Sequence, residues 1–290
     1  MTRLIPIALA LLWGLNWPAV RLCLNEIPPF GLRMIGLTLG AAILFALAKF
    51  TGRSLAVRPD QRLRLITSGI LNIAIFNVTT VFAQLNTTTS RAAILTFTTP
   101  LWSILLARMV LGERLDRPKA IALSIGMTGL ALLAIPLVTG QKNIWGLILP
   151  LTAAFGWAAG TVFQKTHPVE GDRIAITAWQ LLIGAAVALA GFVLTGEHLP
   201  VTLMPITWVA LVFHVVGSTA IAYLLWFMLL DRLSVSAASL TTLSIPVVGV
   251  LSAMLLVGDR PSLADWVGFA AIIVAAATVL LGIGRRDTRA

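Results

Sequence analysis

Long apolar runs are the feature of this sequence that most constrains its fold. Ten such runs alternate with short polar connections, and only 11% of the 290 residues are charged. A helix of about 20 mostly apolar residues crosses the hydrocarbon core of a bilayer, whereas a water-soluble domain carries nearer ~25% charged residues. The chain is therefore predicted to be an all-α integral membrane protein whose main solvent is lipid.

The predicted membrane-spanning helices divide into two sets of five. The first set covers residues 4–24, 30–50, 63–84, 92–111 and 119–138, and the second covers residues 144–164, 174–195, 206–230, 237–257 and 263–284. Arg3 followed by an apolar run resembles a signal peptide, but the cleavage-like triplet Ala8-Leu9-Ala10 lies inside the run. We therefore expect an uncleaved first span.

The basic residues predict the orientation of the spans. With the N-terminus in the cytoplasm, 16 of the 21 Lys and Arg residues fall on the inner side and 5 on the outer side. Because Lys and Arg concentrate in cytoplasmic loops, both termini are expected in the cytoplasm. The net charge of +10 is scattered between apolar runs, so no nucleic-acid partner is predicted. The single cysteine, Cys23, excludes an internal disulfide and a cysteine metal cluster.

An internal repeat divides the chain into two copies, residues 1–140 and 141–290. Matching segments recur at a constant offset of 146 residues: Thr99-Pro100 with Ile245-Pro246, and Gly112-Glu113-Arg114 with Gly258-Asp259-Arg260. Because five spans is an odd number, the second copy enters the bilayer from the opposite side. The sequence thus predicts ten transmembrane helices arranged as two inverted-topology five-helix repeats.

Prolines inside the predicted spans are candidate kink and gating positions. Pro100 and Pro246 lie at matching places in the two copies, and Pro18 lies in the first span. Proline lacks a backbone N–H and clashes with the carbonyl four residues earlier, so it kinks a helix. Paired kinks in two repeats indicate a site where a solute crosses the membrane. Simple bending is the alternative explanation, and Pro18 has no obvious repeat partner.

Aromatic and amide side chains at mid-depth are candidate cavity residues. Trp13, Asn16 and Trp17 share one face of the first span. In the third span Asn77, Thr80 and Gln84 form a polar stripe, which we expect to face inward. Packing would also explain the tryptophans, and hydrogen bonds between helices would also explain the stripe.

The remaining candidates lie in three further spans. Trp102 adjoins Pro100, Trp157 lies in the sixth span, and Tyr223, the only tyrosine, lies in the eighth. A phenol at this depth needs a hydrogen-bond partner. His214 is a candidate carrier of a coupling proton, with a purely structural interhelical histidine as the alternative. Nine residues separate His214 from Tyr223, which places them on opposite faces of an α-helix.

These motifs resemble the drug/metabolite transporter (DMT) superfamily, EamA type. The resemblance is carried by Trp13-Gly14-x-Asn16, by Pro28-Pro29-Phe30 followed by Arg33, and by the stretch from Ser90 through Pro100 to Gly112-Glu113 with its echo around Pro246 and Gly258. It covers nearly the whole chain and implies a basket of ten helices. The nearest resemblance is to YddG-type bacterial aromatic amino acid exporters. This implies an inner-membrane secondary transporter that exports aromatic or neutral amino acids by alternating access.

The resemblance also implies a substrate site. In that family spans one, three, four, six, eight and nine wall a central cavity. Inward positions then fall to Asn16, Trp17, Asn77, Trp102, Trp157 and Tyr223, and the polar stripe adds Thr80. We expect Arg21 and Arg33, near the outer mouth, to extend to lipid headgroups, with attraction of a substrate carboxylate as the alternative.

The sequence is also compatible with functions other than export of amino acids. Another cargo of the same superfamily, such as a nucleotide sugar or a cationic drug, is the main alternative. A membrane-embedded enzyme is disfavoured because no nucleophile with a base, carboxylate pair or metal-ligand set is predicted at mid-depth. No cofactor is expected, and the sequence does not predict an oligomeric state.

Overall fold

The computed structural model describes residues 5–112, 143–232 and 244–287, together with short stretches between 117 and 132. All regular secondary structure in this part of the chain is helical. Most of the predicted span 119–138, the first part of the predicted span 237–257 and the repeat boundary at residue 140 lie outside the described residues. The predicted domain division therefore stays a prediction.

In the first half, the helices follow the predicted spans closely. The first span contains α1 (Ile5–Gly14) and α2 (Asn16–Cys23), and the second is α3 (Pro29–Phe50). The third contains η1 (Pro59–Gln61), α4 (Arg62–Ser68), η2 (Gly69–Ile75) and α5 (Phe76–Asn86), and the fourth contains α6 (Thr89–Thr96) and α7 (Thr99–Leu111).

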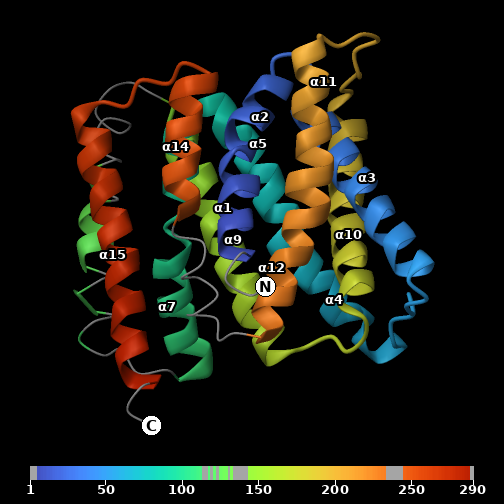
Figure 1. Ribbon diagram of the computed structural model, residues 1–290, viewed down its shortest axis with the longest axis horizontal. Coiled ribbons are helices and arrows are strands. Elements are labelled where there is room, and N and C mark those ends of the chain that lie inside the picture. Colours follow the sequence, from blue (N-terminus) through green and yellow to red (C-terminus); the bar gives the residue numbers. More distant parts are fainter. Residues whose placement is uncertain are drawn as a thin grey trace.

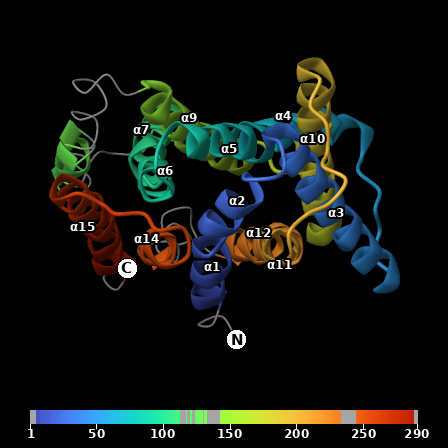
Figure 2. The ribbon, with the colours of Figure 1, turned by 90° about the horizontal axis from the view of Figure 1, so that it is seen from above.

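The described helices of the second half match their predicted spans as well. They are α9 (Trp145–Thr166), α10 (Arg173–Thr195), α11 (Pro205–Val212), η3 (Phe213–Ile221), α12 (Ala222–Arg232), α14 (Ser244–Leu256) and α15 (Leu263–Asp287). Seen from above, α5, α6, α7 and α9 form one row and α1, α11, α12 and α14 face them (Figure 2). Helices α3 and α10 close one end, and α15 lies at the other (Figures 1 and 2).

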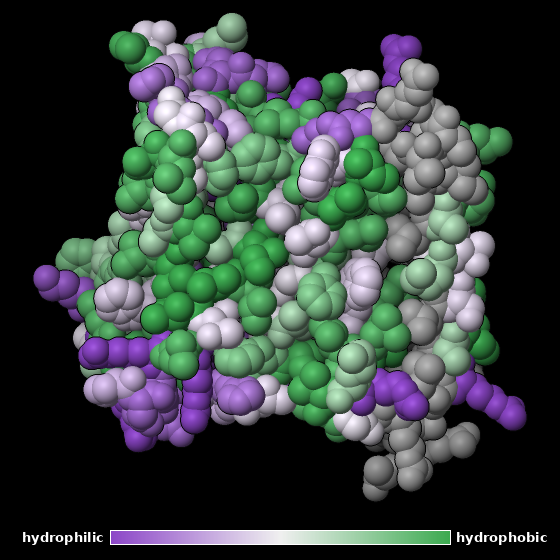
Figure 3. Space-filling model, turned by 180° about the vertical axis from the view of Figure 1, so that it is seen from behind, coloured by the Kyte–Doolittle hydropathy of each residue, from purple (hydrophilic) through white to green (hydrophobic). Residues whose placement is uncertain are grey.

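The helices carry the apolar surface of a membrane protein. Among the described residues, six helical stretches are long and apolar enough to cross a bilayer: Pro29–Phe50, Pro59–Asn86, Thr89–Leu111, Trp145–Thr166, Arg173–Thr195 and Pro205–Leu229. Shorter apolar helices cover Ile7–Cys23, Ile245–Leu256 and Leu263–Ala275. On the face seen in Figure 3, hydrophobic side chains form a broad band, and hydrophilic side chains gather along its upper and lower edges. The count of ten spans stays a prediction.

The internal repeat is visible in the helix geometry. The π-helical segment η2 ends at Ile75 and η3 ends at Ile221, which reproduces the sequence offset of 146 residues. The matching glycines Gly112 and Gly258 follow α7 and α14 with left-handed φ values of 66° and 73°. Glycine adopts this conformation without a steric cost, so both copies stop the helix by the same means.

Helices α3 and α10 pack side by side in opposite directions (Figures 1 and 2). At the start of α3, the backbone N–H of Gly31 donates to Glu197, just beyond the end of α10, at 2.9 Å. At the other end, the indole N–H of Trp179 in α10 donates to the carbonyl of Leu55 at 2.9 Å. The second helices of the two halves are therefore antiparallel.

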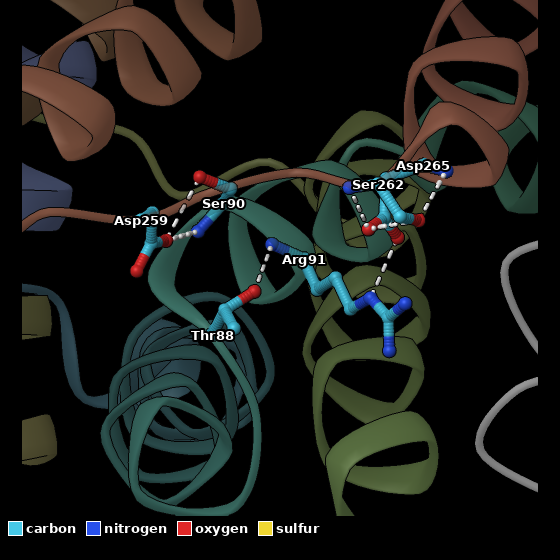
Figure 4. A network of polar contacts seen from close by, with 6 residues as sticks. All are labelled: Thr88, Ser90, Arg91, Asp259, Ser262 and Asp265. Atoms are coloured by element: carbon cyan, nitrogen blue, oxygen red, sulfur yellow. Dashed lines mark hydrogen bonds and ion pairs between the residues drawn. The ribbon is translucent and has the colours of Figure 1, made fainter. Parts of the chain in front are cut away.

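A network of polar contacts joins α6 to the segment between α14 and α15 (Figure 4). The carboxylate of Asp259, in the repeated Gly-acidic-Arg motif, accepts from the N–H and the hydroxyl of Ser90 at 2.7 and 2.8 Å. Beside it, the guanidinium of Arg91 forms a buried ion pair with Asp265 at 2.6 Å. Breaking a buried ion pair leaves an uncompensated charge, so this network fixes the start of α6 firmly.

Asp172 caps the N-terminus of α10. Its side chain accepts from the backbone N–H groups of Ile174 and Ala175 and pairs with Arg53 at 2.7 Å. Burial by itself would raise the pKa of Asp172, yet hydrogen bonds from Arg53 and the two backbone amides hold the pKa below its usual value. The carboxylate therefore stabilises the fold in its charged form.

The change Asp172→Ala is expected to cost about 1 kcal/mol of stability at neutral pH, because it removes the cap and the ion pair. A lowered pKa means that the charge-dependent part is complete above the unfolded pKa of about 3.9 and is lost as the pH falls through the folded value. Thermal unfolding in detergent should show the gap to wild type shrinking below about pH 4. Asp172→Asn, which keeps the cap, should lose less stability than Asp172→Ala. A gap that stays constant through the acidic range would contradict the assignment.

Candidate functional site

A cavity lies between helices of both halves of the chain. It encloses about 970 Å³ of empty space when its opening is included. Its walls come from α1, α2, α3, α5, α6, α7, α9, η3, α12 and α14.

Most of the predicted site residues line this cavity. Six of the seven predicted substrate-facing residues do so, together with one of the three prolines and the predicted histidine: Asn16, Trp17, Asn77, Thr80, Trp157, Tyr223, Pro100 and His214. The structure thus brings together side chains from the first, third, fourth, sixth and eighth predicted spans.

Trp102 is not among the lining residues. Its ring packs edge-on against Phe155 at a centroid distance of 5.5 Å, and Phe155 is 44% exposed. The indole therefore packs against α9, and its Nε1 is buried. The resemblance implies an inward position for Trp102, but Ser103, the next residue of α7, lines this cavity instead.

Pro100 marks a real interruption between α6 and α7. Because Pro100 has no N–H, the carbonyl of Thr96 lacks its helical donor and instead accepts from the hydroxyl of Thr99 at 2.8 Å. Thr96, Thr99 and Pro100 all line the cavity. The interruption therefore presents hydroxyl and carbonyl groups to the interior.

The other two prolines are buried outside the cavity wall. The first span is interrupted at Leu15, three residues before Pro18, and the carbonyl of Gly14 accepts a long hydrogen bond of 3.5 Å from Ser252. Pro246 is the third residue of α14, and the residues that would show a kink before it lie outside the described part of the chain. Gating by the three prolines stays a prediction.

Five aromatic rings make up one wall of the cavity. The rings are Trp13, Phe76, Trp157, Tyr223 and Trp226. Neighbouring rings lie with their centroids 4.8 to 6.0 Å apart in edge-on or tilted arrangements. Such pairs contribute about 0.5–1.5 kcal/mol each beyond the burial of their area. We call this set the aromatic wall.

A hydrogen bond between the two halves borders the aromatic wall. The amide nitrogen of Asn77 donates to the hydroxyl of Tyr223 at 2.7 Å and to the carbonyl of Ile73 at 2.9 Å. Asn77 and Tyr223 are 146 residues apart, which is the offset of the sequence repeat. Equivalent positions of the two copies are therefore bonded to each other, and the phenol has the partner that its depth requires.

His214 is held in a chain of polar contacts. Its Nδ1 lies 2.8 Å from the amide oxygen of Asn16, and its Nε2 lies 3.5 Å from a guanidinium nitrogen of Arg33. Another guanidinium nitrogen of Arg33 donates to the hydroxyl of Thr80 at 3.2 Å. The contacts fit a structural histidine, and the role of His214 in proton coupling stays a prediction.

The expectation that His214 and Tyr223 face opposite sides was wrong, because both line the cavity. The reason is the π-helical geometry of η3, which spans Phe213–Ile221. With i→i+5 hydrogen bonds a turn takes about 4.4 residues, so residues nine apart return to the same face. The sequence gives no signal for this change of period.

Two glycines of α3 let η3 approach closely. A Cβ on Gly36 would lie 2.6 Å from Nε2 of His214, and a Cβ on Gly40 would lie 2.6 Å from Cγ2 of Thr219. Real side chains do not tolerate such distances, so only glycine fits. The spacing of four residues thus serves helix packing within the chain, and it places His214 beside Arg33.

The expectation for Arg33 was also wrong. Instead of extending to the headgroups, its side chain is 3% exposed and lines the cavity. Arg21, by contrast, is half-buried and donates to the carbonyl of Gln84 at 2.9 Å. The proximity of Arg33 to Gly36 in the sequence is the only signal that points to its burial, since a close helix approach covers that face.

Comparison with known proteins decides the family. A model of the EamA-like transporter family matches residues 3–135 and again 144–281. The chain belongs to this family. EamA-like proteins are part of the DMT superfamily, so the chain is a multi-pass membrane transporter of small molecules. The family and the names of its relatives indicate a transporter, not an enzyme.

Individual relatives cover most of the chain at low identity. The uncharacterized transporter YoaV of Bacillus subtilis is 25% identical over 84% of this chain and 84% of its own length. A probable amino-acid metabolite efflux pump of Escherichia coli is 27% identical over 86% of this chain and 84% of its own length. One crystal structure, 22% identical, covers 98% of both chains with a TM-score of 0.72, which shows a shared fold.

The contact between Asn77 and Tyr223 should be measurable as coupling between the halves. In a double-mutant cycle with Asn77→Leu and Tyr223→Phe, we expect a coupling energy of about 0.6 kcal/mol, the usual size for hydrogen bonds between membrane helices. Reversible unfolding in mixed micelles measures it. Thr79→Ala combined with Tyr223→Phe is the control, because Thr79 donates to the backbone of its own helix. Equal coupling in both cycles would show that the contact is not specific.

Proposed function

We propose that this protein is a secondary transporter that exports aromatic and neutral amino acids across a bacterial inner membrane. The observation that carries the proposal is the aromatic wall, which faces a cavity that also contains hydroxyl, amide and guanidinium groups. A ring-bearing solute would contact the rings, and its polar groups would meet the hydrogen-bonding side chains. The name of the Escherichia coli relative, a probable amino-acid metabolite efflux pump, supports the same substrate class.

Alternating access is the mechanism that we propose for export. The repeat offset, the antiparallel pair α3 and α10 and the interruption at Pro100 support two inverted halves that rock about the cavity. In this proposal the chain has ten spans with both termini in the cytoplasm, and Pro18, Pro100 and Pro246 act as hinges. Solute is released on the outer side when the halves exchange their positions.

Inverted topology predicts that Gly112 and Gly258 lie on opposite sides of the membrane. A reporter that is active only outside the cytoplasm, fused after each glycine in turn, should be active at Gly258 and silent at Gly112. The two glycines end equivalent helices with equivalent backbone geometry, so each fusion is the matched control of the other. Activity at both positions, or at neither, would overturn the inverted arrangement.

Transport by the purified full-length chain tests the substrate class. In proteoliposomes, radiolabelled phenylalanine, tyrosine and tryptophan should exchange in counterflow, whereas lysine and a nucleotide sugar should not. Trp157→Ala removes the central ring of the aromatic wall and should lower exchange about three- to tenfold. Trp102→Ala, the matched control, removes a tryptophan outside the cavity and should retain exchange. Preferential exchange of the nucleotide sugar would point to the other cargo class.

A further inference from the structure

Three side chains on the cavity wall have a buried polar atom without a hydrogen-bond partner. These atoms are Nε of Arg33, Oε1 of Gln84 and Nε1 of Trp226. A buried donor or acceptor that is left unpaired costs about 1–3 kcal/mol, and most native structures avoid it. Where such atoms border a cavity, a ligand can supply the missing partner.

Arg33 carries a positive charge that no carboxylate balances among the described residues. It takes part in none of the ion pairs there, and its known contacts are the neutral groups of Thr80 and His214. Glu26, the acidic residue nearest in the sequence, accepts instead from the N–H of Met204 and the hydroxyl of Thr207. A guanidinium without a neighbouring carboxylate can bind the carboxylate of a ligand through two parallel N–H groups.

Gln84 offers the complementary group. It is 2% exposed and lies one helical turn beyond Thr80, the residue that Arg33 contacts. Residues four apart on a helix have Cβ atoms about 5–6 Å from each other, so Gln84 and the Arg33 contact lie on the same face of α5. The unpaired atom of Gln84 is its amide oxygen, which accepts hydrogen bonds from an ammonium group.

The other polar side chains of this region already have partners. Asn77 donates to Tyr223 and to the backbone, Asn16 contacts His214, and the hydroxyl of Thr80 accepts from Arg33. Of the three open atoms, Nε1 of Trp226 belongs to the aromatic wall, and the other two form a pair of a cationic donor on Arg33 and a neutral acceptor on Gln84. An α-amino acid carries a carboxylate and an ammonium on a single carbon, which matches this pair.

We propose that Arg33 and Gln84 form a head-group site for a zwitterionic α-amino acid. Arg33 binds the carboxylate, Gln84 accepts from the ammonium, and the side chain of the solute lies toward the aromatic wall. The proposal rests on the proposed function, in which the cargo is an amino acid. It adds that selectivity for the zwitterion comes from two residues on different helices of the first half, α3 and α5.

Binding to the purified full-length protein tests the head-group site apart from transport. Trp13, Trp157 and Trp226 line the cavity, so quenching of tryptophan fluorescence reports occupancy. The three probes are L-phenylalanine, phenethylamine, which lacks the carboxylate, and 3-phenylpropionate, which lacks the ammonium. Wild type should bind phenylalanine about 10- to 100-fold more tightly than either analogue.

Two variants separate the roles of the two residues. Arg33→Gln should remove the preference for phenylalanine over phenethylamine and keep the preference over 3-phenylpropionate. Gln84→Leu should remove the preference for phenylalanine over 3-phenylpropionate and keep the preference over phenethylamine. Arg58→Gln removes an exposed guanidinium outside the cavity, so it should keep both wild-type preferences.

The outcomes distinguish the head-group site from the proposed function. Equal binding of phenylalanine and phenethylamine by wild type, or an unchanged preference in Arg33→Gln, would overturn the site even if counterflow proceeds. Selective binding of phenylalanine without counterflow would reject export and keep the site. If Arg33→Gln does not fold, the three wild-type affinities and the binding preferences of Gln84→Leu still test the head-group site.

Discussion

The absence of water from the hydrocarbon core is the constraint on which the rest of this structure depends. Every backbone N–H and carbonyl there needs a partner within the protein, so the apolar stretches that the structure describes are helical. Departures from α-helical geometry are tolerated where polar groups find partners inside the molecule. The interruptions at Leu15 and before Pro100, and the segments η2 and η3, all adjoin residues of the cavity. Irregular backbone and polar side chains thus occur together.

The two copies meet in the interior rather than only at their surfaces. Asn77 and Tyr223 are separated by the repeat offset of 146 residues and bond to each other. Their chemistry is different, however, and the surroundings differ as well. Arg33 and Gln84 come from the first copy, whereas three of the five rings of the aromatic wall come from the second. The two copies have diverged, so the residues that line the cavity differ between them.

Much of the fold was predictable because apolar runs and breakers act locally. The ends of α3, α9 and α10 lie within a few residues of the predicted spans, and the repeated glycines end equivalent helices. The family resemblance implied inward positions for Asn16, Asn77 and Tyr223, and all three line the cavity. The burial of Arg33 could not be predicted, because it depends on which helix covers the charged side chain. The face of η3 that lines the cavity could not be predicted either. The number of residues per turn in η3 depends on hydrogen bonds that the sequence does not encode locally.

The close packing at Gly36 has a consequence for how this cavity is tuned. A missing side chain on α3 allows the imidazole of His214 to reach the guanidinium of Arg33. The guanidinium of Arg33 is thus held in place because Gly36, one turn further along the same helix, has no side chain. Related chains that carry a bulkier residue there would have to place this charge elsewhere.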